Sequence, residues 1–410
     1  MATAQSGGRE PFFIDDPALL DDPYAAFARY RAESPVYHHA PVDQWFVFRH
    51  GDVSDLFRDP RLSADRMKGF VDQAPEAVRP ELRAIVPLFE SWTIMKDGPE
   101  HTRLRHALNQ GFNATAVKAL APLIEASANQ LIDERVRDGR FDVADDYGFR
   151  LPAHILSDFL GVHVEDRDKI IEWSVDFVDF FNEIPITEAT THRLSRSVSA
   201  MNDYTMDLIN ERRRSPKNDF LGTLLASADT PGGLSDTEIV GNAILLLLAG
   251  HIAVRNMIGN IFFLLDGLPE ARAQLDANPA LLEPMVDEAL RFEAPVTLIP
   301  RVALEPIEVA GITIPEGALV QLSIASANRD ETQFPDPDRF DIARRPGHIL
   351  SFGRGPHGCA GAHLARMQGA IATRVLLARY PAIRRDEDKP IVWYRTAANR
   401  GPINLPMRVD

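Results

Sequence analysis

One stretch near the middle of the chain is apolar at almost every position, and it predicts a long helix within residues 234–270. Ser235 and Glu238 have the spacing of a capping box at its start, and Gly267 marks its end. A helix that is apolar on nearly all sides is buried, so we expect it to run through the centre of the molecule. Gly250, in the apolar run, indicates either close helix packing or a local widening that admits a ligand.

The rest of the sequence has two parts, which differ in the spacing of their apolar residues. Apolar residues recur at helical spacing from about residue 20 to residue 295. After residue 295, short runs separated by turns indicate strands, and a proline-rich segment precedes a glycine-rich loop and one last long helix. The pattern predicts a mainly α fold with a small β portion, in a single large domain over residues 11–410. We expect residues 1–10 to be disordered.

Composition and charge narrow the class of protein. The chain has 410 residues and a net charge of −15, and such an acidic surface repels nucleic acid and anionic membranes. We therefore expect neither as a partner. Cys359 is the single cysteine, which excludes an intrachain disulfide and fits a reducing compartment. The sequence shows no signal peptide and no apolar run of the roughly 20 residues that a membrane span needs, so we expect a cytoplasmic protein.

The densest chemical signal is the segment FGRGPHGCAG at residues 352–361. Its cysteine lies where a loop turns into a helix, and a helix N-terminus lowers the thiol pKa and favours the thiolate. A lone cysteine is usually a small buried hydrophobe, and a thiol nucleophile would need a base such as His357. A zinc site would need more cysteines or clustered histidines. The remaining interpretation is an axial thiolate ligand to a haem iron.

This segment resembles the cysteine-loop signature of the cytochrome P450 family at several positions. The matching residues are Phe352, Gly353, Gly355, His357, Cys359 and Gly361. Three further segments resemble the family in order along the chain: DGPEHTRLR at residues 97–105, EALR at residues 288–291 and FPDPDRFD at residues 334–341. The resemblance covers nearly the whole chain, and it implies the cytochrome P450 fold of the soluble bacterial type.

The resemblance also implies a cofactor, haem b (heme b, iron protoporphyrin IX), with Cys359 as the metal ligand. The family holds the two haem propionates at the positions that match His101, Arg105, Arg301 and His357. Carboxylates inside a protein need cationic or N–H donors, which agrees with this assignment. The two other cofactor-binding positions are Phe352, expected to pack against the haem edge, and Gly361.

Structural and substrate-contact roles follow from the same resemblance. We expect the Glu288 carboxylate to join Arg291 and Arg339 in a buried cluster that anchors the cysteine-loop side. The residues expected to contact substrate are Phe89, Trp92, Ile94, Leu248, Val296, Leu298 and Ile299. Three phenylalanines at helical spacing belong either to a lid or to the core: Phe177, Phe180 and Phe181. The apolar character of these positions favours a largely hydrophobic small-molecule substrate.

The central helix departs from the family pattern at its oxygen pocket. Ala249 and Gly250 match that pattern, but Ile252 and Ala253 stand where an acid and an alcohol are usual. A hydroxyl positions water and an acid relays protons from solvent, and these two apolar side chains do neither. We expect Arg255, one turn beyond Ile252, to pair with an acidic neighbour.

The sequence thus predicts an enzyme: a haem-thiolate monooxygenase of a specialised (secondary-metabolite) pathway, with ferredoxin and ferredoxin reductase as electron donors. Three explanations of the missing pair stay open. A polar group of the substrate organises the protons, peroxide replaces dioxygen, or the reaction is an oxidative coupling, a dehydrogenation or a non-oxidative rearrangement. A different class is a non-catalytic haem-bound protein that recruits a partner. We expect ferredoxin to dock near the cysteine loop through Arg103, Arg354 and Arg366.

Overall fold

A computed structural model gives the fold. It describes residues 12–409 except 15, 68–70, 72–73, 183–185, 218, 229 and 231, so residues 1–10 lie outside the described residues. The helices are α1 (Pro17–Asp21), α2 (Tyr24–Glu33), α3 (His50–Leu56), α4 (Arg79–Glu90), α5 (Gly98–Gly111), α6 (Ala114–Ala119), α7 (Ala121–Arg135), α8 (Arg150–Leu160), α9 (Arg167–Asn182), α10 (Glu188–Arg214), α11 (Phe220–Ala228), α12 (Asp236–Gly267), α13 (Pro269–Ala277), α14 (Leu282–Phe292), α15 (Ile324–Ala327) and α16 (Ala362–Arg379). Helices dominate, as the sequence predicts.

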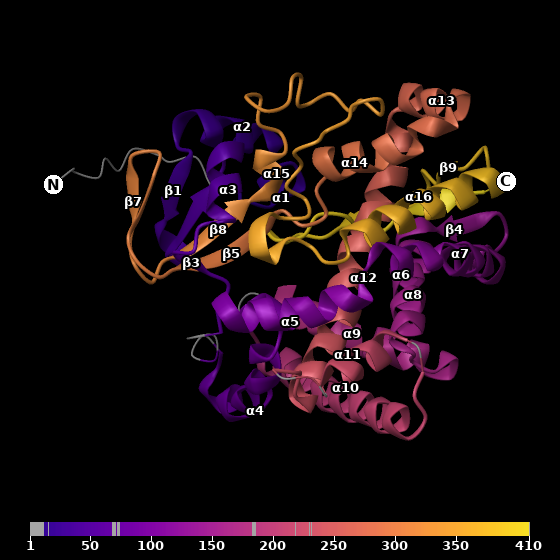
Figure 1. Ribbon diagram of the computed structural model, residues 1–410. Helices are drawn as coiled ribbons and strands as arrows, with labels where there is room; N and C mark the ends of the chain where they lie inside the picture. Colours follow the sequence, from indigo (N-terminus) through magenta and orange to yellow (C-terminus); the bar gives the residue numbers. More distant parts are fainter. Residues whose placement is uncertain are drawn as a thin grey trace.

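The β portion consists of one larger sheet and several small ones. The five-stranded sheet has the order β1 (Val36–His39), β2 (Gln44–Val47), β8 (Leu319–Ser323), β5 (Leu298–Ala303) and β3 (Leu62–Ser63). The small sheets pair β4 (Arg140–Asp142) and β9 (Arg384–Arg385) with β12 (Pro406–Arg408), β6 (Ile307–Val309) with β7 (Ile312–Ile314), and β10 (Val392–Trp393) with β11 (Pro402–Asn404). β2 and β8 run parallel, with Trp45 opposite Val320. The five-stranded sheet lies at one side of the molecule and most helices at the other (Figure 1).

The predicted central helix is α12, which runs through the middle of the molecule (Figure 1). The Ser235 side chain accepts from the Glu238 N–H, and the Glu238 carboxylate accepts from the Ser235 N–H at 2.8 Å, which completes the predicted capping box. Its length and composition alone would let α12 cross a membrane, but most of its apolar stretch is buried in this fold, as in a core helix. A Cβ atom on Gly250 would lie 2.7 Å from Leu156 Cδ1, so this glycine serves close packing against α8.

A buried carboxylate on α14 holds two arginines. Glu288 accepts from Arg291 Nε and Nη2 at 2.7 and 2.8 Å, and both residues are fully buried. The second guanidinium is that of Arg344, whose Nε donates to Glu288 Oε1 at 3.1 Å. The prediction of Arg339 for this role is therefore wrong. The tight turn before Arg339 directs its main chain toward α14, and its carbonyl accepts from Arg291 Nη2 at 3.3 Å.

Arg344→Met is expected to lower the free energy of unfolding by about 3 kcal/mol, because the variant removes one partner of a fully buried carboxylate. Its exposed neighbour offers a matched control, since Arg345→Met should change stability by less than about 0.5 kcal/mol. Arg339→Met should likewise have a small effect. Urea unfolding curves followed by circular dichroism measure all three variants. A loss in Arg339→Met as large as that in Arg344→Met would contradict the assignment.

Candidate functional site

The glycine-rich segment forms a tight loop that presents Cys359 just before α16. The φ angles of Gly353 and Gly355 are 62° and 70°, a conformation that side chains rarely adopt. A Cβ atom on Gly355 would also lie 2.9 Å from the carbonyl oxygen of Phe57. The Cys359 N–H donates to the Phe352 carbonyl at 2.8 Å, and this hydrogen bond closes the loop. The cysteine itself is exposed. The predicted role of glycine in this loop, tight turns and close approach, agrees with this geometry.

The pKa of the Cys359 thiol is shifted in the opposite direction to the one that the sequence predicts. Although the side chain is exposed on one side, burial by the surrounding protein raises its pKa. A hydrogen bond from the Gly361 N–H and the charges of Arg105 and Arg366 lower the pKa but do not offset burial. The expected hydrogen bond from a loop N–H to the sulfur is present, but the expected net lowering of the thiol pKa is wrong, because burial outweighs it. Because a bound metal cation deprotonates a coordinating thiol outright, this cysteine fits a metal ligand better than a free nucleophile.

The four side chains predicted to hold carboxylates cluster beside this loop. The rings of His101 and His357 lie 4.2 Å apart, and Arg105 Nη2 donates to the Gly358 carbonyl at 2.6 Å. Burial, followed by the charges of His101 and Arg301, lowers the pKa of His357 to about 4. The buried His101 Nε2 has no hydrogen-bond partner within the described part of the chain. These N–H and guanidinium donors therefore fit the two carboxylates of a haem.

Two neighbours of this cluster were not found by sequence reasoning. Asp97 accepts from Ser63 Oγ at 2.5 Å and lies 3.5 Å from His357 Nε2. Its position directly before α5 is typical of an N-cap and was the available signal. Arg66 carries no motif, and burial followed by the charge of Arg301 lowers its pKa to about 10. The structure thus adds one acid and one further cation to this region.

The two sides of α12 differ in chemistry. Ala249 is exposed and Ile252 and Ala253 are partly exposed, as expected for side chains that border an internal site, whereas the predicted site residue Gly250 faces Leu156 of α8. His251 faces the end of the π-helical segment Val143–Phe149 instead: its Nε2 lies 2.6 Å from the Phe149 carbonyl oxygen, and the two rings stack at 4.1 Å. Burial lowers the pKa of His251 to about 3, so its imidazole is neutral and is not a proton relay at neutral pH.

Arg255 does not make the predicted ion pair. Its Nη1 donates to the Tyr394 hydroxyl at 2.8 Å and its Nη2 to the Ile403 carbonyl. Its partners among the residues that the structure describes are a hydroxyl, a carbonyl and two aromatic rings, and none is a carboxylate. The expectation of an acidic partner is therefore wrong, because the side chain extends toward β10 and β11 rather than along α12.

The residues predicted to contact substrate occupy two kinds of environment. Phe89, Trp92 and Leu298 are buried in the hydrophobic core, whereas Leu248 and Ile299 are only partly buried. Ile94 is 36% exposed. Among the lid phenylalanines, Phe177 and Phe180 are buried and Phe181 is 45% exposed, with its ring 5.9 Å from that of Phe89. Core packing thus accounts for most of the aromatic residues, and Ile94 and Phe181 stay exposed.

A loop that the sequence did not single out packs beside the predicted distal segment. Val296 forms a β-bridge with Asn399, and the Thr297 N–H donates to the Ala398 carbonyl at 3.0 Å. The Thr297 hydroxyl donates to the Ala397 carbonyl. Residues 397–399 therefore lie next to Val296, and they are further candidates for substrate contact.

A helical domain with a cysteine loop and a cluster of carboxylate-binding donors defines a haem-thiolate oxidoreductase. Comparisons with known proteins agree. The cytochrome P450 family model matches residues 87–392. The chain is 35% identical over 409 residues to the vitamin D(3) 25-hydroxylase of Pseudonocardia autotrophica (98% of this chain, 97% of that protein) and 33% identical over 405 residues to the 6-deoxyerythronolide B hydroxylase of Saccharopolyspora erythraea (95% and 96%).

One solved structure is similar to this chain in both fold and sequence. It is the cytochrome P450 enzyme CxnD for C–S bond formation in chuangxinmycin biosynthesis, with a TM-score of 0.83, 33% identity and coverage of 95% of this chain and 94% of that one. The chain belongs to the cytochrome P450 family. It is an oxidoreductase of the monooxygenase class, its family implies a haem iron cofactor, and its bacterial relatives take electrons from redox partner proteins.

Cys359→Ser is expected to abolish the red-shifted Soret band of the reduced, carbon monoxide-bound protein, because that band requires a thiolate ligand. The variant should also retain less haem, since a serine hydroxyl is a poorer iron ligand. Absorption spectra of the reduced protein with and without carbon monoxide measure both effects. His363→Ala, an exposed histidine on α16, serves as the control and should leave the band in place. A Cys359→Ser protein with an unchanged band would remove Cys359 as the ligand.

Proposed function

We propose that the protein is a cytoplasmic haem b monooxygenase that oxidises a small, largely hydrophobic molecule in a specialised pathway. The donors around His101 and His357 support a cofactor with two carboxylates, and haem b has two. The partly exposed apolar residues Ile94, Leu248 and Ile299 support a hydrophobic substrate. Relatives named for vitamin D(3) and 6-deoxyerythronolide B support a role in the tailoring of such molecules.

The observation that carries the mechanism is the chemistry of α12. The haem, when bound, supplies the oxygen chemistry, and the protein has to supply protons. Ile252 and Ala253 cannot hold or relay a proton, and the nearby polar side chains of His251 and Arg255 are turned toward Phe149 and Tyr394. We therefore assign the proton-positioning role to a polar group of the substrate, or to water that this group holds. Arg301, Arg105 and the two histidines keep their role of binding the cofactor carboxylates.

A second candidate is an atypical reaction. The same absence of an acid and an alcohol on the haem side of α12 favours peroxide as the oxidant, or a step without hydroxylation. The CxnD enzyme, 33% identical, is named for C–S bond formation rather than for hydroxylation. Oxidative coupling, dehydrogenation and non-oxidative rearrangement belong to this candidate. A non-catalytic recruitment role has no comparable support, because the cysteine loop and the carboxylate-binding donors are complete.

Restoring the family's pair, with Ile252→Glu and Ala253→Thr, is expected to raise the product formed per electron consumed on hydrocarbon ligands. The reason is that positioned proton transfer is worth about 10²–10⁴-fold in rate, which decides whether electrons yield product or peroxide. The native substrate should gain less, since its own polar group already organises the protons. Assays of product, of electrons consumed and of peroxide measure how the electrons divide between product and peroxide.

Two outcomes would decide against this mechanism. Tight coupling of the unmodified enzyme on a substrate with no polar group near the iron would overturn the role of the substrate. Full turnover with peroxide, together with no turnover on reduced ferredoxin, would select the second candidate instead. The variant with Leu246→Thr, a partly exposed residue elsewhere on α12, controls for a nonspecific effect of added polarity.

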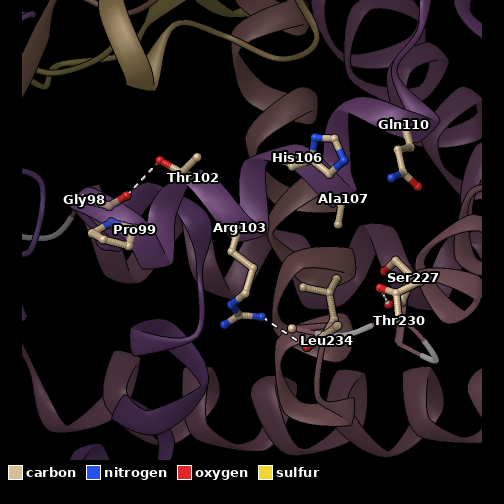
Figure 2. A pocket seen from close by; sticks show the side chains of 12 residues that line it. Gly98, Pro99, Thr102, Arg103, His106, Ala107, Gln110, Ser227, Thr230 and Leu234 are labelled. Carbon is tan, nitrogen blue, oxygen red and sulfur yellow. Dashed lines mark hydrogen bonds between the residues drawn. The ribbon is translucent and has the colours of Figure 1, made fainter.

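Electron transfer requires a docking surface near Cys359, and we assign it to ferredoxin with ferredoxin reductase as the upstream donor. The three predicted docking arginines are not equivalent. Arg103 of α5 pairs with Glu238 in the first turn of α12. It also reaches across to the segment before α12, where it donates to the Gly233 carbonyl (Figure 2). Arg366 pairs with Asp287 at 2.6 Å and lies over the Phe352 ring. Arg354 contacts Ser54 and His348 and has no carboxylate within 4 Å among the described residues.

Arg354→Glu is therefore expected to slow association with ferredoxin by about tenfold at low salt, because it reverses a positive charge that no acid neutralises. Arg103→Glu should slow association less and destabilise the fold more, since it places a second carboxylate against Glu238. Stopped-flow reduction of the enzyme at several salt concentrations measures the rate. Association that does not depend on salt, or equal effects of both variants, would contradict this docking surface.

A further inference from the structure

A cavity of about 530 Å³ lies on the side of α12 that faces away from Ala249 and Ala253. Two residues along an α-helix turn the side chain by about 200°, so Arg255 points nearly opposite to Ala253. The cavity is open to solvent on one side and is lined by the π-helical segment Val143–Phe149, by α9 and α10, and by the ends of β10 and β11. Cavities of this size hold small organic molecules.

The inner end of the cavity holds a cation without a counter-charge. Arg255 is 5% exposed, and its guanidinium lies over the rings of Phe149 at 4.9 Å and Tyr394 at 5.5 Å. Its described hydrogen bonds go to one hydroxyl and one carbonyl, and its buried Nε has no partner among the described residues. Burial raises the pKa of Tyr394, so the phenol is neutral and does not balance the charge. A buried guanidinium normally has a carboxylate partner, because burying an unpaired charge is costly.

The other residues that line the cavity indicate the chemistry of a molecule that would pair with Arg255. Val178 and the ring of Phe149 supply apolar walls beside Arg255. The outer part holds Arg193, which is already paired with Asp176 at 3.3 Å and Asp179 at 3.4 Å, so this group carries one excess negative charge and offers no free cation to an anion. Asp145 is exposed to solvent, and water and salt screen its charge. The inner end is therefore the part of the cavity that attracts an anion.

We propose that this cavity binds a small organic acid, whose carboxylate pairs with Arg255 and whose apolar body lies against Phe149 and Val178. The guanidinium offers N–H groups in the planar arrangement that a carboxylate accepts. The occupant lies across α12 from the haem side, so it is a second ligand and not the molecule that is oxidised there. The site is independent of the identity of the substrate and of the source of the protons.

Hexanoate is a suitable probe, with hexanol as the neutral analogue of the same chain length. Calorimetric titration of the holoenzyme, with imidazole bound to the iron to exclude ligation there, measures binding to this cavity. Hexanoate is expected to bind at least about tenfold more tightly than hexanol, since only the acid pairs with Arg255. Arg255→Met should remove this preference.

Two further variants keep the test decisive. Val178→Trp fills the cavity while it keeps Arg255, so it should weaken hexanoate binding even if Arg255→Met does not fold. Arg213→Met removes an arginine of α10 that pairs with Asp236 outside the cavity, and it should leave the affinity unchanged. Loss of affinity in either folded cavity variant, with none in Arg213→Met, supports the site. Equal binding of acid and alcohol, affinity unchanged in every folded cavity variant, or an equal loss in Arg213→Met would overturn it.

Discussion

The buried carboxylate of Glu288, neutralised by two arginines, stabilises the part of the chain that carries Cys359. Glu288 is fully buried, and two guanidiniums share its charge. One of them, Arg291, also donates to the Asn328 carbonyl at 2.9 Å, and the Asn328 side chain donates to Ser351 Oγ at 2.8 Å. Ser351 directly precedes the glycine-rich loop. A continuous hydrogen-bond path therefore joins α14 to the cysteine loop, and the position of the thiol depends on a charge that is far from the chemistry.

The central helix shows how a family scaffold keeps its shape while its chemistry changes. α12 retains its cap, its burial and its close contact with α8 through Gly250. Ile252 and Ala253 replace the polar pair that the family usually carries, and the polar side chains next to them, His251 and Arg255, contact Phe149 and Tyr394 instead. Ile252 and Ala253 are only partly buried, so the fold of α12 does not depend on a polar pair at these positions.

The sequence predicted the elements whose signals are local. The capping box, the glycine loop and the helical texture each depend on neighbouring residues, and all three agree with the structure. The errors concern partners that are distant in sequence or set by backbone direction. Arg344 replaces Arg339 because a turn reorients the main chain, and Arg255 finds Tyr394 instead of an acid. The thiol pKa was also misjudged, because burial by surrounding atoms is invisible in a sequence and here outweighs the favourable charges.

The parallel pairing of β2 with β8 has a consequence for how the protein comes to be folded. Trp45 lies opposite Val320, so the five-stranded sheet joins segments separated by most of the chain. During synthesis, the first two strands leave the ribosome long before their partner exists, and their edge stays unpaired until residues 319–323 have been made. Contacts between such distant segments form slowly and expose intermediates to aggregation. Productive expression therefore depends on conditions that protect this early hairpin, such as slow synthesis, low temperature or available chaperones.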